Sequence, residues 1–202
     1  RTENVWKFNG HAQPGRDVLK GGKDYRQTVR IFQRGLQTPV RVTFNVWRLL
    51  PHLAGKIGMQ IEPDSVAIAR TLMADTTAAH YGFNRNTFIA MFIPNTYELY
   101  WNTTPTGFID RMHTEYERFW NDDRLSKLSE TGLSQIQAIT LASIVYEETK
   151  MSDEMPTVAG VYMNRIQQNH KLEADPTVKY AVGDFGLRRI LFKHLEIDSP
   201  YN

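Results

Sequence analysis

Two adjacent glutamates in the second half of the chain have the residue type and spacing for acid–base chemistry. Leu141, Ile144 and Val145 recur at helical spacing and form one apolar stripe. The next position on that stripe is Glu148, whereas Glu147 falls on a polar face. We therefore predict that Glu148 points toward the core and that Glu147 faces solvent.

A carboxyl group at the end of an apolar stripe would favour its neutral form. Burial disfavours the charged form, and the negative end of the helix dipole acts in the same direction. A carboxylic acid that stays protonated can donate a proton to the leaving oxygen of a glycosidic bond. On periodicity alone, a structural role has the better support, with Glu148 capping the helix or pairing with Arg165.

Other classes of chemistry find little support in the composition. The chain of 202 residues has no cysteine, which rules out thiol catalysis, disulfides and cysteine-bound metals. Its six histidines lack ligand spacing, and no phosphate-binding glycine loop or G-x-S-x-G motif occurs, so no metal and no cofactor is expected. A net charge of +2 argues against a nucleic-acid partner, and no apolar run reaches the roughly 20 residues of a membrane span.

Hydrophobic patterns divide the chain into two expected domains with an α+β fold. Alternation of apolar and polar residues over 40–46 predicts a half-buried strand, and two short helices follow it. A change of composition near residue 80 separates a small α/β module, 1–80, from a mixed, helix-rich domain, 81–202. The helices of the second domain are predicted over about 106–120, 123–130, 134–149 and from 152 onward.

Polar residues cluster after the last of these helices begins. Its buried face is predicted to carry Val158, Val161, Tyr162 and Ile166. Further on, Asp175 stands before a proline and is predicted to be the N-cap of another helix, a role better supported than that of a second catalytic carboxylate.

Four motifs of the second half, in this order and spacing, resemble the MltG (YceG-like) endolytic murein transglycosylases. They are LASIVYEET at 141–149, VAGVYMNR at 158–165, LEADPTVKY at 172–180 and DSPYN at 198–202. FIPNTY at 92–97 and a LysM-like segment around Thr38 resemble the same family, so that the resemblance spans most of the chain.

The resemblance implies a LysM-like module followed by a lysozyme-like catalytic domain. In this family the catalytic acid is the Glu of a Glu-Thr pair, which is Glu148 in this sequence. Family members continue past the Tyr-Asn motif, so a C-terminally truncated catalytic domain is expected. The residues implied to orient the sugar and the glutamate are Asn164, Arg165, Asp175, Thr177, Tyr180, Tyr201 and Asn202.

The implied activity is that of an endolytic peptidoglycan lytic transglycosylase. Such an enzyme cleaves the bond between N-acetylmuramic acid and N-acetylglucosamine, leaves 1,6-anhydro ends and terminates nascent glycan strands. The implied partners are peptidoglycan glycan strands and peptidoglycan synthases. The resemblance also implies a single-pass inner-membrane anchor, through an N-terminal helix absent from this chain, and a catalytic domain that faces the periplasm.

Two alternatives stay open at the level of the sequence. The first is a non-catalytic module that binds peptidoglycan and scaffolds partners. The second is a hydrolase in which Glu148 works with Asp175 or Asp198 as a second carboxylate. Analysis of reaction products separates all three possibilities.

Overall fold

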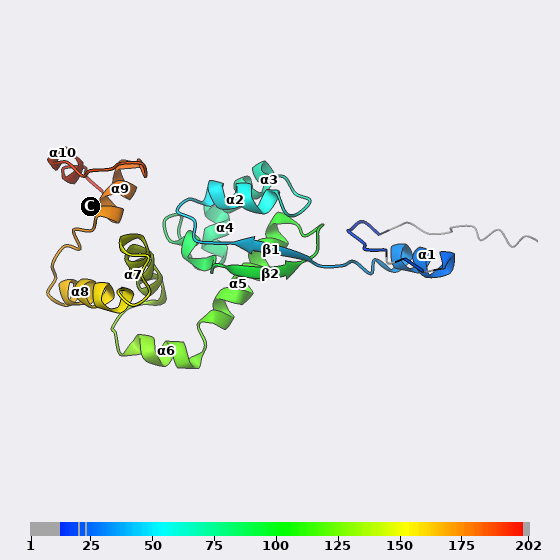
Figure 1. Cartoon of the computed structure of the whole chain (residues 1–202), viewed down its shortest axis with the longest axis horizontal. Helices are drawn as coiled ribbons and strands as arrows, with labels where there is room; N and C mark the ends of the chain where they lie inside the picture. The colour runs from blue at the N-terminus through cyan, green and yellow to red at the C-terminus, as the bar shows by residue number, and fades with distance from the viewer. Residues whose placement is uncertain (1–12, 20, 23, 200–202) are drawn as a thin grey trace, which may run out of the picture. The chain divides into compact units, whose positions relative to one another are not determined.

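The computed structural model describes residues 13–19, 21–22 and 24–199, and the chain separates into two compact units (Figure 1). The units are Arg1–Asn121 and Asp122–Asn202. The sequence placed a domain boundary near residue 80 instead.

Strand pairing explains why the first unit extends beyond residue 80. Strand β1 (Val40–Phe44) pairs antiparallel with β2 (Asn95–Leu99), and Val42 lies opposite Tyr97. Two segments more than 50 residues apart in sequence are thereby joined by one hydrogen-bonded ladder. The change of composition near residue 80 therefore falls inside a compact unit.

Strand β1 shows the predicted alternation but is shorter than predicted. Val40, Val42 and Phe44 are buried, while the residues between them are exposed. The strand ends at Phe44, so Val46 does not continue the apolar face and is 42% exposed. The prediction was thus right for the pattern and wrong for the last residue.

Helices complete the core of the first unit. Phe44 contacts Tyr97 and Phe108, with ring centroids 5.5 and 6.4 Å apart respectively. Helix α2 packs against α3, and α3 packs against α5. The helical elements of this unit are α1 (Tyr25–Arg34), α2 (Leu50–Gly58), α3 (Ser65–Leu72), α4 (Asp75–His80), the 3-10 helix η1 (Phe88–Met91) and α5 (Pro105–Phe119).

One side chain forms hydrogen bonds with the backbone of β1 on the edge that faces away from β2. The amide of Gln60 accepts a hydrogen bond from the Thr43 N–H at 2.9 Å and donates one to the Thr43 carbonyl at 3.1 Å. The same amide nitrogen donates to the Lys56 carbonyl at 2.9 Å, which ties the strand to α2. A glutamine side chain thus occupies the place that a third strand would take.

The regular structure of the second unit, in its described residues, consists of helices joined by turns and loops. The predicted helices of this part of the chain are confirmed, with ends that differ by a few residues. Ser134 is the N-cap of α7, and its capping box is completed by the side chain of Gln137. The helices are α6 (Asp122–Ser129), α7 (Gln135–Glu148), α8 (Met155–Gln167), α9 (Asp175–Val182) and α10 (Phe192–Leu195).

The predicted buried face of α8 is narrower in the structure. Tyr162 is buried, but Val161 and Ile166 are exposed and Val158 is half-buried. Helix α8 packs on α7, and Tyr162 is the buried residue of α8 in that contact. None of the helices in the described part of the chain combines the length and the apolar character that a bilayer crossing requires.

We predict that Phe44→Ala destabilises the first unit by about 3–5 kcal/mol, because it removes a fully buried ring. All four tryptophans lie before residue 122, so their fluorescence during urea unfolding reports on the first unit alone. Val46→Ala is the control and should change the free energy of unfolding by less than about 0.5 kcal/mol. Equal effects of the two variants would contradict the assigned end of β1.

Candidate functional site

The end of α7 presents its two glutamates differently from the prediction. Leu141, Ile144 and Val145 are buried as predicted. Glu148, however, is exposed, so the prediction that it points into the core is wrong. Glu147 is the more buried of the two, with a side chain that is 24% exposed and lies 3.5 Å from the Lys150 ammonium.

Helix α7 ends immediately after Glu148. Thr149 is the C-cap and has extended backbone angles, φ −135° and ψ 145°. Thr149 is only 8% exposed, so the buried residue at this end of the helix is the threonine and not Glu148. Because Glu148 is exposed, its carboxyl group is open to a ligand from solvent.

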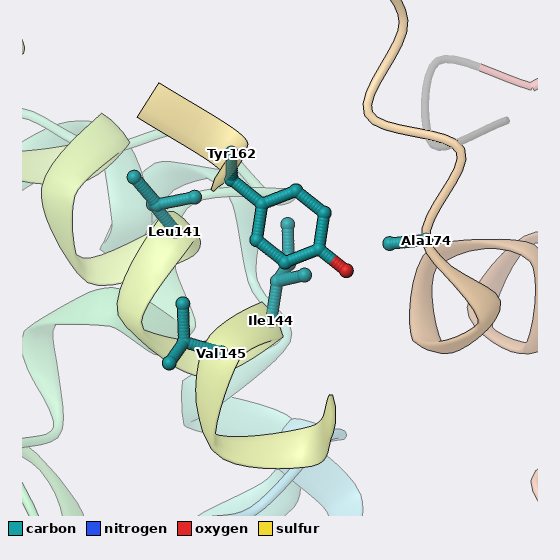
Figure 2. Close-up of a cluster of buried hydrophobic side chains, with 5 residues drawn as sticks. All are labelled: Leu141, Ile144, Val145, Tyr162 and Ala174. Atoms are coloured by element: carbon teal, nitrogen blue, oxygen red, sulfur yellow. The ribbon is translucent and has the colours of Figure 1, made fainter. Parts of the chain in front are cut away.

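A tyrosine from α8 contacts Glu148 from the core side. Tyr162 is 6% exposed and packs among Leu141, Ile144 and Val145. Its hydroxyl lies on the side toward Ala174, at the edge of the apolar cluster (Figure 2). Burial raises the pKa of Tyr162, and the charge of Glu148 and a hydrogen bond to it raise this pKa further.

Arg165 holds the loop that joins α8 to α9. Its guanidinium donates to the Leu172 carbonyl and lies 3.7 Å from the Glu173 carboxylate. It also lowers the pKa of Tyr162, so it lies close enough to the tyrosine for its charge to act there. The alternative in which Arg165 forms the ion pair of Glu148 is not what the structure shows, because the guanidinium pairs with Glu173 instead.

The backbone of this loop adopts two left-handed conformations without glycine. Asn169 has φ 55°, and the amides of Asn169 and His170 bond back to the carbonyls of Ile166 and Arg165 at 3.0 and 2.8 Å, which closes a Schellman motif. Glu173 has φ 49°, a conformation that costs an L-residue free energy. The loop thereby returns the chain to α7 and α8 at Ala174, which is buried.

Asp175 is not the N-cap that the sequence predicted. The N-cap of α9 is Ala174, and Asp175 is the first helical residue, with proline after it. No side chain caps the first turn, and the Thr177 hydroxyl donates to the Ala174 carbonyl at 2.8 Å. Asp175 is exposed, and its charge contributes to the raised pKa of Tyr162.

The structure thus brings some of the candidate residues together. Glu148, Arg165 and Asp175 all act on the hydroxyl of Tyr162. Thr177 lies in the first turn of the helix that carries Asp175, and Tyr180 packs its ring against Phe185 at 5.9 Å. Asn164 is exposed on α8. Tyr201 and Asn202 lie outside the described residues.

Sequence reasoning missed two residues of this site. Tyr162 was predicted to be buried, but its hydroxyl was given no partner. Thr149 was read only as the neighbour of Glu148. A signal for both was present, because each places a hydroxyl on an otherwise apolar face. In the described part of the chain, no group of His, Cys, Asp or Glu side chains could hold a metal ion.

With this geometry established, the chain can be compared with known proteins. A sequence profile of the YceG-like family matches residues 2–202. The chain belongs to the YceG-like family. A protein of Bacillus subtilis (strain 168) named endolytic murein transglycosylase is 39% identical to this YceG-like chain over 77 residues, which are 38% of the chain and 21% of that protein.

Two further comparisons agree with this membership. A protein of the same name from Streptococcus pneumoniae serotype 2 (strain D39 / NCTC 7466) is 28% identical over 113 residues, 54% of this chain and 20% of that protein. The matches therefore span about a fifth of the length of these relatives. The crystal structure of a YceG-like protein of Listeria monocytogenes superposes with a TM-score of 0.67 at 21% identity, covering 91% of this chain and 66% of the other, which shows a shared fold.

We predict that Glu148→Gln lowers the pKa of Tyr162, because it removes the negative charge and weakens the acceptor that raise this pKa. NMR titration of ring-labelled tyrosine measures it, with Tyr162→Phe to assign the resonance. Glu147→Gln is the matched control and should leave the titration of Tyr162 unchanged. A shift of equal size in both variants would contradict the assigned contact.

Proposed function

We propose that this chain carries the catalytic region of an endolytic peptidoglycan lytic transglycosylase, with Glu148 as its acid. The observation that supports this most directly is the placement of Glu148, which is an exposed carboxyl group at the end of a helix whose other face is buried. The names of the two relatives favour an enzyme over a peptidoglycan-binding scaffold.

Charge pairing supports this role for Glu148 rather than for its neighbour. Among the ion pairs of the described residues, Lys150 pairs with Glu147, and Arg165 pairs with Glu173. A fixed cation on the catalytic carboxyl group would oppose proton donation, because it favours the charged form. The contact of Glu148 is instead a hydroxyl, which can orient a carboxyl group without such a charge.

The proposed reaction uses one carboxyl group twice. Glu148 first donates its proton to the glycosidic oxygen between N-acetylmuramic acid and N-acetylglucosamine, and the C1–O bond breaks. The resulting carboxylate then accepts the proton of the muramyl C6 hydroxyl, whose oxygen bonds to C1. This closes the 1,6-anhydro ring, restores the acid and consumes no water.

The position of Asp175 gives a second candidate, a hydrolase with two carboxylates. Because Ala174 rather than Asp175 is the N-cap, the Asp175 side chain is not required for capping. Its charge also reaches the same tyrosine hydroxyl as that of Glu148. Two carboxyl groups that flank a glycosidic bond can activate water or form a glycosyl-enzyme intermediate. The ends of the product fragments distinguish this hydrolase from the lytic transglycosylase.

The family resemblance also supports a role for the first unit and a location for the protein. We propose that Arg1–Asn121 includes a LysM-like module that binds glycan, a role supported by the α-helices α2, α3 and α4, which lie between β1 and β2 in the same compact unit. We further propose peptidoglycan synthases as partners and a periplasmic catalytic region anchored to the inner membrane, supported by the same family.

We predict that Glu148→Gln abolishes cleavage of purified glycan strands while the far-UV circular dichroism stays unchanged. The amide has the shape of the acid but cannot supply its proton. Glu147→Gln should retain activity within about threefold, since its carboxylate pairs with Lys150 at the surface. An active Glu148 variant beside an inactive Glu147 variant would refute the assignment.

The products provide a separate prediction. Intramolecular attack by the C6 hydroxyl gives fragments with anhydro ends, each about 18 mass units lighter than its hydrolytic counterpart. Mass spectrometry of a digest of long strands should show these fragments, released from strand interiors. Reducing ends that carry the extra water would favour the hydrolase with Glu148 and Asp175.

A further inference from the structure

Thr149 is the one buried residue of polar or charged type among those that the structure describes. A buried hydroxyl group costs free energy unless it is hydrogen-bonded. Oγ1 of Thr149 makes two such bonds. It donates to Oε2 of Glu154 at 2.6 Å and accepts the N–H of Met151 at 3.1 Å. Both bonds link Thr149 to residues that follow it in the chain.

The two bonds join the end of α7 to the start of α8. The Thr149 N–H still donates to the Val145 carbonyl at 3.1 Å, and the chain then leaves the helix. On the other side, the N–H groups of Glu154 and Met155 donate to the Met151 carbonyl at 3.1 and 3.3 Å. The turn between the helices is therefore closed on itself, and Thr149 is its centre.

We propose that Thr149 and Glu154 form a positioning pair that fixes Glu148 at the last residue of α7. This inference rests on the proposed function of Glu148. Neither side chain needs to touch the substrate, because the peptide bond between 148 and 149 carries the constraint directly. The acceptor is a carboxylate, which makes the 2.6 Å bond a charge-assisted one, stronger than a bond between neutral groups.

The pair acts together with Tyr162. The Thr149 turn sets where the backbone of Glu148 lies, and the Tyr162 hydroxyl contacts its carboxyl group. Loss of the Thr149 hydroxyl leaves the Met151 N–H without its acceptor and lets the turn relax. A displacement of a catalytic group by about 1 Å can cost up to about a hundredfold in rate.

Thr149→Val tests the pair, since it keeps the shape of the side chain and removes the hydroxyl. We expect kcat on purified glycan strands to fall by about ten- to a hundredfold with KM within about twofold. Thr149→Ser should restore most of kcat. Thr140→Val is the matched control, because it removes an exposed hydroxyl that donates to the Ile136 carbonyl of the same helix, and its kcat should not change.

Glu154→Ala tests the other member, with Asp153→Ala as the control for loss of a neighbouring negative charge. Both side chains are exposed, so neither truncation removes buried volume. Glu154→Ala should lower kcat as Thr149→Val does, and the double variant should lose little more than either single one, because residues that act as a unit are not additive. If Thr149→Val does not fold, the other two variants test the pair. A lowered kcat in Glu154→Ala together with a nearly normal kcat in Thr149→Ser supports it, and an unchanged kcat in Glu154→Ala contradicts it.

A readout independent of catalysis separates this inference from the proposed function. If the turn positions Glu148, Thr149→Val should move the NMR titration of Tyr162 in the direction of that of Glu148→Gln. An inactive wild type with this shift present would overturn the proposed function and keep the pair. An active wild type with unchanged kcat and unchanged Tyr162 titration in Thr149→Val would overturn the pair.

Discussion

The buried hydroxyl of Thr149 is the constraint on which the second unit depends. It ends α7 at Glu148, starts the turn that leads to α8 and belongs to the residue that is buried at this end of the helix. Helix α8 begins directly after this turn, at Met155. Tyr162 reaches the apolar stripe of α7 from there, and the loop after α8 returns Asp175 to the same tyrosine.

The contrast between Glu147 and Glu148 shows what periodicity can and cannot predict. An apolar stripe at 3.6 residues per turn located the helix, its cap at Ser134 and its three buried side chains. It could not locate the last residue, because the helix ends through a side-chain bond between Thr149 and a residue five positions later. Glu148 is the last helical residue and is exposed although it follows the apolar stripe, whereas Glu147 is partly buried.

The same limit applies at the start of α9 and at the boundary between the units. Asp175 before a proline is typical of an N-cap, yet the helix begins one residue earlier than this pattern predicts, with Ala174 as the N-cap. Residue 80 marks a change of composition, yet the pairing of β1 with β2 spans it. At the boundary between the units, a contact between distant segments decided the outcome, and a single sequence without strand pairing does not contain that information. The family motifs, by contrast, depend on residue identity and located Glu148 without any of these contacts.

The glutamine at the edge of β1 restricts how the first unit can associate. A free edge strand offers unpaired N–H and carbonyl groups to any extended chain, which is the usual route to strand addition and to aggregation. Gln60 occupies both groups of Thr43, so this stretch cannot take up a peptide as a third strand. At Thr43, therefore, this edge of the small sheet has no free backbone group to offer to an extended peptide or to the strand of a second copy.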